Sequence, residues 1–343
     1  MKKILVTGGT GYIGSHTVVE IQKSGFEPLI IDNLSNSDPG VVDLIGRITG
    51  QRPLFEQIDL CDLPAMQDFF KRHHDLEGVI HFAAHKSVGE SVKHPLKYYH
   101  NNLGGLFHLL QCMLTHKTAR IVFSSSCTVY GQPDQLPVTE NAPVQQAESP
   151  YGNTKRISEE IIHDTAKASH LKAISLRYFN PIGAHESGLI GELPIGVPDN
   201  LIPFITQTAI GKREKLMVFG NDYNTPDGTC IRDYIHVSDL ARAHVVALQR
   251  MTGEDSKQPH EIFNLGTGRG YSVLEAIRTF EQVSGVELNR EFAGRRPGDI
   301  EQVWADTTLA NLKLGWKAEK GLEEMMASAW KWEQNLATGI MNK

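Results

Sequence analysis

Cysteines are few and scattered in this sequence of 343 residues. The four of them, Cys61, Cys112, Cys127 and Cys230, form no Cys-x-x-Cys pair. In a chain of this length such cysteines are typical of free, reduced thiols, so we expect a cytoplasmic protein. The fifteen histidines form neither an HExxH motif nor a cluster with cysteine. We therefore predict no metal site.

Long apolar runs and an excess of positive charge are also missing. No apolar stretch approaches the ~18 residues that a membrane span needs. The start, MKKILVTGG, has only four apolar residues before glycine, so we interpret it as a strand and not as a signal peptide. The net charge is −6, which gives no basic surface for nucleic acid. We predict neither a membrane nor a nucleic-acid partner.

Short apolar runs alternate with helical patterns through the first half of the chain. This alternation predicts an α/β fold, a Rossmann-type doubly wound parallel sheet with helices on both faces. The expected strands are residues 3–9, 28–33, 53–59, 78–84, 119–126 and 172–180. The expected helices are about 13–23, 95–116 and 150–168.

The pattern changes after Asn180, where glycine and proline become frequent. We expect a smaller mixed α/β substrate lobe from residues 181–232 and 264–343. The first domain, a Rossmann domain, would comprise residues 1–180, with a return segment at about 233–263. Other elements expected here are a strand and helix over 232–251, capped at Ser238 or Asp239, a helix near 272–284, and a C-terminal helix with Trp330 and Trp332.

A glycine-rich segment, VTGGTGYIGSH, spans residues 6–16. Gly8, Gly11 and Gly14 follow the first strand and open the first helix, where glycines permit a tight turn and close approach to a pyrophosphate. The helix N-terminus offers free N–H groups to phosphates. Asp32 ends the second strand, where a carboxylate can hold both ribose hydroxyls and repel a 2′-phosphate. The segment therefore predicts NAD binding, the alternative being a glycine-rich turn without a ligand.

A second candidate is SPYGNTKRISEE, residues 149–160. Ser149 suits a helix N-cap and Pro150 the first helical position. Tyr151 and Lys155, four residues apart, then lie on one helix face. An isolated pair of this kind is most often a tyrosine packed on a lysine stem, so the rest of the chain must decide its role.

Segments along the whole chain resemble one known superfamily. They include GYIGSHT, DNLSNS, KSVGES, SSSCTVYG, SPYGNTK, RYFNPIGAH, RDYIHVSDLA, FNLGTG and RRPGD. Together they are similar to the extended short-chain dehydrogenase/reductases, and most of all to the UDP-hexose 4-epimerases among them. The resemblance implies NAD as cofactor, interconversion of UDP-galactose and UDP-glucose through a 4-keto sugar, and a homodimer.

Such a reaction needs a group that carries the proton of the sugar 4-hydroxyl. Tyr151 can do so if its pKa falls from about 10 to near 7, a change of roughly 4 kcal/mol. One positive charge ~4 Å away at an effective dielectric of ~20 supplies about that much. Lys155 is the candidate, helped by the oxidised nicotinamide and the helix N-terminus.

The serines that end the fifth strand complete the expected catalytic set. The resemblance assigns Ser126 to the 4-oxygen and places Ser124 and Ser125 nearer the cofactor. Related dehydratases and decarboxylases carry Asp or Glu directly after this serine, because elimination needs an added acid or base. Cys127 and Thr128 occupy those positions here, which favours a reaction that goes no further than the 4-ketone and then returns the hydride. Without the resemblance, the serines would be polar residues at a strand end.

The resemblance implies further contacts on both sides of the reacting atoms. Cofactor contacts would be Gly8, Gly11, Tyr12, Ile13, Gly14, Asp32, Asn33, Asp59, Leu60, Phe82, Ala83, Ala84, Lys86, Asn101, Ser124, Tyr151, Lys155 and Tyr178. Substrate contacts would be Ser126, Tyr151, Asn180, Asn200, Leu201, Arg232, Arg296, Asp299 and Val303. Arginine suits bidentate contact with a diphosphate.

Alternatives remain for several of these residues. Lys86 can be a solvated lysine, Asp59 a helix cap, and Arg232, Arg295 and Arg296 surface-turn arginines.

Val303 stands where relatives restricted to plain hexoses carry a tyrosine. The smaller side chain suggests room for an N-acetyl group. Two other function classes stay open. One is a net oxidoreductase that releases NADH, and the other is an NAD-sensing scaffold, which would be expected to lose Tyr151 or Lys155.

Overall fold

The computed structural model describes residues 1–145, 147–253, 256, 258–296 and 299–342. Its centre is a seven-stranded sheet in which every pairing is parallel. The spatial order is β10 (His260–Leu265), β6 (Lys172–Tyr178), β5 (Arg120–Ser124), β4 (Leu76–His81), β1 (Lys3–Thr7), β2 (Glu27–Asp32) and β3 (Leu54–Gln57). The chain starts at β1, builds outward to β3 and then returns to β4. The order therefore reverses between β1 and β4, which is where doubly wound sheets bind ligands.

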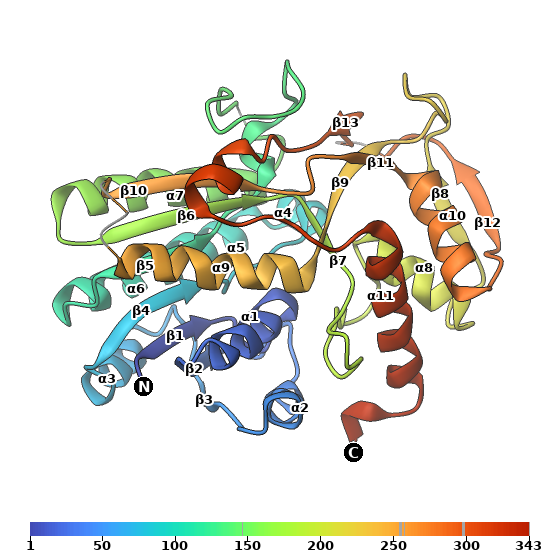
Figure 1. The fold of residues 1–343 in the computed structure, drawn as a ribbon. Helices are drawn as coiled ribbons and strands as arrows, with labels where there is room; N and C mark the ends of the chain where they lie inside the picture. Colours follow the sequence, from blue (N-terminus) through green and yellow to red (C-terminus); the bar gives the residue numbers. More distant parts are fainter. Residues whose placement is uncertain (146, 254–255, 257, 297–298, 343) are drawn as a thin grey trace.

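Helices cover both faces of this sheet because successive strand residues point in opposite directions. Ile4 and Val6 pack in the apolar layer beneath one set of helices, whereas Leu5 packs in the opposite layer. The first layer holds α1 (Tyr12–Lys23), α2 (Gly40–Thr49) and α9 (Val237–Thr252). The second holds α3 (Leu63–Arg72), α6 (Gly105–Thr115) and α7 (Pro150–Ala168). The predicted doubly wound α/β fold is confirmed (Figure 1).

A smaller lobe lies beside the sheet (Figure 1). Its central strand, β9 (Ile231–His236), pairs with β7 (Asn180–Ile182), β11 (Gly270–Ser272) and β13 (Gln302–Val303). A separate pair joins β8 (Leu216–Phe219) to β12 (Arg290–Ala293). The helices α8 (Leu201–Ala209), α10 (Val273–Ser284) and α11 (Leu322–Ala337) enclose its apolar core. Short turns η3 (Ala310–Leu314) and η4 (Ile340–Asn342) flank α11.

The helix expected over 95–116 is interrupted. It consists of α5 (Pro95–Tyr98), a π-helical turn η1 (Tyr99–Gly104) and α6, and the short α4 (Val88–Lys93) precedes it. Such π turns often lie at functional sites, and this one carries Asn101 to the wall of a cavity.

The predicted cap of α9 is wrong. His236 is the N-cap, and its Nδ1 accepts from the Ser238 N–H at 3.0 Å. The Asp239 carboxylate instead accepts from the backbone N–H groups of Glu319 and Lys320, so it joins α9 to the chain before α11.

Two elements that follow the start of the smaller lobe in the sequence pack against elements from the first half of the chain. α9 packs beside α1, and β10 extends the large sheet next to β6. The division at 180, 232 and 264 stays a prediction. Over the described ranges, no helix combines the length and the apolarity that crossing a membrane requires.

Candidate functional site

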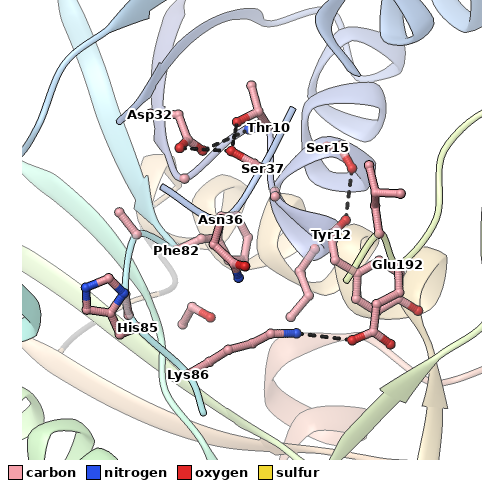
Figure 2. Close-up of a pocket in the computed structure, with 18 of the residues that line it drawn as sticks. Thr10, Tyr12, Ser15, Asp32, Asn36, Ser37, Phe82, His85, Lys86 and Glu192 are labelled. Carbon is pink, nitrogen blue, oxygen red and sulfur yellow. Dashed lines mark hydrogen bonds and ion pairs between the residues drawn. The ribbon is translucent and has the colours of Figure 1, made fainter. Parts of the chain in front are cut away.

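A cavity of about 410 Å³ opens at the carboxyl ends of the central strands. Its walls are the glycine-rich loop after β1, the end of β2, the loops after β4 and β5, the start of α7, and residues of the 180–200 segment. Figure 2 shows part of this wall. The position fits the general rule for open α/β sheets.

The glycine-rich loop is shaped by two steric demands. Gly8 has φ of +71°, a region that L side chains disfavour. A Cβ at Gly14 would lie 2.2 Å from the Gly8 carbonyl oxygen, so no side chain fits there. The loop therefore packs tightly on α1, and the first free N–H groups of α1 lie at the cavity, ready for an anion.

Asp32 anchors the loop after β2 (Figure 2). Its carboxylate accepts from the Thr10 N–H at 3.3 Å and from the Ser37 hydroxyl at 3.1 Å. Ser37, which was not predicted as a site residue, also bonds the Thr10 hydroxyl at 2.7 Å. The carboxylate lies at the cavity wall, where it suits a ribose diol better than a phosphate.

Asp59 lies next to Asn33 at the same end of the cavity. Its carboxylate accepts from the Asn33 amide at 3.0 Å and from the Cys61 N–H at 2.8 Å. Burial alone would raise the pKa of Asp59, but these hydrogen bonds outweigh burial and lower it. The cap of α3 is Asp62, which accepts from the Ala65 N–H. The helix-cap alternative for Asp59 is therefore wrong.

The start of α7 follows the prediction closely. Ser149 is the N-cap, accepting from the Gly152 N–H at 3.1 Å, and Pro150 is the first helical residue. Tyr151 and Lys155 lie on the buried face and line the cavity. The Lys155 ammonium donates to the Ser124 carbonyl at 2.7 Å and lies 4.9 Å from the centre of the Phe123 ring.

The three serines after β5 point to different partners. The Ser124 hydroxyl bonds the Tyr178 hydroxyl at 2.9 Å, and both residues line the cavity. Ser126 also lines the cavity and opens the short turn η2 (Cys127–Tyr130), accepting from the Thr128 N–H at 3.2 Å. Ser125 instead donates to Glu159 at 2.5 Å and does not line the cavity. Ser125 thus lies behind the cavity wall, and its expected nearness to a cofactor stays a prediction.

The pKa values of the tyrosine–lysine pair are set mainly by burial. Burial raises the pKa of Tyr151 above its ordinary value, and the Ser126 hydroxyl only partly opposes this. The Lys155 ammonium lies 6.0 Å from the centre of the Tyr151 ring. Burial also lowers the pKa of Lys155 to about 8. In the protein alone, burial therefore dominates and the pKa of Tyr151 is raised. The predicted fall of this pKa toward 7, which also invokes the oxidised nicotinamide, stays a prediction.

The carboxylate of Glu192, which was not predicted as a site residue, lies at the cavity wall. Glu192 Oε1 lies 3.1 Å from Lys86 Nζ (Figure 2) and accepts from the Asn200 amide at 2.6 Å. Its backbone carbonyl accepts from the Trp332 indole at 2.9 Å. Lys86 thus lines the cavity and is ion-paired, and its side chain is also exposed to solvent. The only signal was a carboxylate inside the glycine- and proline-rich segment IGELPIG.

The cavity gathers most of the predicted site. All predicted cofactor contacts line it, as do the substrate contacts Ser126, Tyr151, Asn180 and Asn200. The remaining substrate contacts do not line it: Leu201, Arg232, Arg296, Asp299 and Val303.

These outer residues lie in the smaller lobe. Arg232 on β9 pairs in register with Val303 on β13. Its charge opposes the effect of burial, which raises the pKa of the cavity residue Cys127 to about 12. The exposed Arg296 forms an ion pair with Asp299 at 2.9 Å. The intervening Pro297 and Gly298 of the RRPGD motif lie outside the described residues.

Comparisons with known proteins agree over nearly the full chain. Residues 5–329 match a family model described as GDP-mannose 4,6 dehydratase. The chain is 52% identical to the UDP-glucose 4-epimerase of Bacillus subtilis (strain 168), covering 98% of both chains.

Two solved structures are similar throughout. One is the UDP-glucose-4-epimerase from Stenotrophomonas maltophila with bound NAD and formylated UDP-arabinopyranose, at 48% identity and a TM-score of 0.95, covering 99% of this chain and 100% of that one. The other is the UDP-glucose 4-epimerase from Bifidobacterium longum in complex with NAD+ and UDP, at 43% identity and a TM-score of 0.94, covering 98% and 100%.

Proposed function

Since the chain belongs to the family described by the GDP-mannose 4,6 dehydratase model and, within it, to the UDP-glucose 4-epimerases, we propose that it interconverts UDP-galactose and UDP-glucose in an NAD-dependent reaction. The route is a transient 4-keto sugar. One observation carries the proposal: Tyr151, Lys155 and Ser126 line the same cavity as the glycine-rich loop and Asp32.

The residues present fit NAD. The steric cradle at Gly14 leaves the start of α1 open to a pyrophosphate, and Asp32 is placed for a ribose diol. We propose Asn33, Asp59 and Lys86 as further contacts. When bound, NAD supplies the acceptor for the hydride that leaves carbon C4 and then returns it to the opposite face.

The chain's own groups would move the hydroxyl proton. Tyr151 takes the proton of the 4-hydroxyl and gives it back, while Ser126 bonds the 4-oxygen. A tyrosine whose pKa is raised by burial needs positive charge near it to ionise, and Lys155 and the oxidised nicotinamide are the cations proposed for this.

The two positions after Ser126 carry no acid for elimination, although the family model is named for a dehydratase. Cys127 and Thr128, which line the cavity beside Ser126, are not carboxylic acids. Burial raises the pKa of Cys127 to about 12, so its thiol stays neutral and is a poor acid or base near pH 7. The oxidation therefore goes no further than the ketone, which is reduced again when the hydride returns.

The UDP end is assigned to the smaller lobe. We propose that Arg232 and Arg296 bind the diphosphate, as their paired guanidinium donors suit. The uridine ribose is assigned to Asp299, and Asn180, Asn200 and Leu201 are assigned to the rest of the nucleotide sugar. Several of these residues lie outside the cavity. The smaller lobe would therefore have to bring them to the substrate.

Val303 motivates a proposal on substrate range. It is buried, 5% exposed, and packs with Val129, Tyr130 and Phe179. A valine here leaves more room than a tyrosine, so we propose activity on UDP-N-acetylhexosamines as well. UDP-GlcNAc should be turned over beside UDP-glucose, and Val303→Tyr should lose the acetylated substrate selectively. Absence of any turnover of UDP-GlcNAc by the wild type would sink this idea.

An apolar surface supports a homodimer. Val88, Val92, Leu96 and Phe107, on α4 to α6, are exposed, Leu96 at 81% and Phe107 at 61%. Exposed apolar side chains that gather on one surface favour association, and we propose that these four do so. We also propose a cytoplasmic location, which the free cysteines Cys61, Cys112, Cys127 and Cys230 support.

Tyr151→Phe tests the proposed chemistry. Proton transfer by a positioned side chain contributes about 10²–10⁴-fold, so conversion of UDP-galactose to UDP-glucose should fall by about that factor. Tyr271→Phe removes the same atom from β11, outside the cavity, and should leave the rate unchanged. A Tyr151→Phe enzyme as active as the wild type would show that another group carries the proton.

A further inference from the structure

A buried ion pair lies behind the reacting side chains. Arg177 on β6 donates to both carboxylate oxygens of Glu159 on α7, with Nη2–Oε2 at 2.5 Å and Nε–Oε1 at 2.9 Å. Both residues are buried. Two-point contacts of this kind are directional as well as strong, and a partner left alone in such a place is costly. The proposed chemistry does not use either residue.

The ion pair is hydrogen-bonded to both ends of the turn that carries Ser126. The Ser125 hydroxyl donates to Glu159 at 2.5 Å, immediately before Ser126. Arg177 Nη1 donates to the Tyr130 hydroxyl at 2.9 Å, at the far end of η2. Tyr130 in turn donates to the Asn264 amide oxygen at 2.7 Å. The position of the Ser126 hydroxyl is thus fixed relative to α7, the helix that also carries Tyr151.

Glu159 also faces Lys155, one helical turn earlier on the same buried side of α7. Burial lowers the pKa of Lys155, and the charge of Glu159 opposes that effect. Among the described residues, His81 on β4 and Tyr151 on α7 lie near Lys155, and Tyr178 on β6 lines the same cavity.

These neighbours carry no charge near pH 7. Burial lowers the pKa of His81 to about 3 and raises that of Tyr178 to about 12, and that of Tyr151 is raised as well. Glu159 therefore supplies the negative charge that acts on Lys155.

We propose that Glu159 is a positioning residue of the site: it fixes the Ser126 turn through Ser125 and Arg177, and it keeps Lys155 protonated where proton transfer takes place. The inference rests on the proposed epimerase function. Glu159 touches neither the substrate nor the cofactor in this account, and acts only through its neighbours.

The test is the pH dependence of kcat/KM for UDP-galactose in the NAD-loaded enzyme. Glu159→Gln keeps the size of the side chain and removes its charge. Lys155 should then lose its proton at lower pH, so the alkaline limb of the profile should move down by about one pH unit. A merely structural role would lower the rate at every pH and leave the limb in place.

Two further variants sharpen this test. Glu160→Gln makes the same change at the next residue of α7, where the side chain is exposed and pairs with Arg156, and its alkaline limb should coincide with that of the wild type. If Glu159→Gln alone fails to fold because Arg177 is left unpaired, Glu159→Gln with Arg177→Met removes both buried charges, and its limb should still move down.

The outcomes separate this inference from the function on which it rests. A wild type that does not convert UDP-galactose would defeat the proposed function. A wild type that converts it, with an alkaline limb unmoved in the Glu159 variants or moved equally in Glu160→Gln, would overturn only the role of Glu159.

Discussion

Lys155 is a buried cation, only 4% exposed, and burial lowers its pKa from 10.5 to about 8. Between these two values the unfolded chain binds more protons at this site than the folded one. The stability of the fold therefore rises with pH through that window. Below about pH 8, burial of the charged Lys155 destabilises the fold by its full amount. The shift corresponds to roughly 3 kcal/mol.

Lys155→Met should consequently raise stability while it lowers activity. We expect the free energy of unfolding of the NAD-free protein to rise by up to about 3 kcal/mol at pH 7. The gain over the wild type should shrink as the pH approaches 10.5. Urea denaturation at several pH values measures this. A variant that is less stable than the wild type, by an amount independent of pH, would contradict it.

Single residues were predictable where a motif fixes their neighbours. Asp32 lies at the end of a strand and Tyr151 at the start of a helix, so the local pattern predicts their surroundings. Glu192 and Glu159 were missed, because their importance comes from partners far along the chain, Lys86 and Arg177. The raised pKa of Tyr151 was missed as well, since desolvation depends on packing that a sequence does not display.

The first turn of α7 contributes both to the stability of the fold and to the position of Tyr151. The Ser149 side chain satisfies the Gly152 N–H, and Tyr151 lies between them in the sequence. Removing such a cap costs about 1 kcal/mol and loosens the turn that holds the reacting phenol.

Ser149→Ala should therefore lower the free energy of unfolding by about 1 kcal/mol and reduce kcat as well. Ser272→Ala removes the matching cap of α10, away from the cavity. It should cost at least as much stability, because Ser272 also bonds Asp227, and leave kcat near that of the wild type. Denaturation and rate measurements on both variants decide this, and equal kcat values in the two would refute the link.

Elements with a strong local pattern were predicted well. The alternation of apolar runs and helices predicted the parallel sheet, and the Ser-Pro pair predicted where α7 begins. The strands β7 and β13 were missed, since they span three and two residues and exist only through pairing with β9. The π turn around Asn101 was missed because the helical period continues through it.

At the scale of the whole molecule, the proposed dimer rests on the patch of α4 to α6. Leu96→Asp places a charge in that patch and should convert a dimer into a monomer, as light scattering after size exclusion would show. Leu312→Asp is a matched control, because Leu312 is 79% exposed but lies on η3. A monomeric wild type, or equal loss of the dimer in both variants, would contradict the assignment.

In the proposed reaction, an oxidation and a reduction are completed within one cavity. The most direct measurement follows UDP-galactose, UDP-glucose and NADH together, in protein purified with its cofactor and without added NAD. We expect many turnovers to UDP-glucose with no accumulation of NADH. NADH that accumulates in step with the loss of UDP-galactose would contradict it and identify a net oxidoreductase instead.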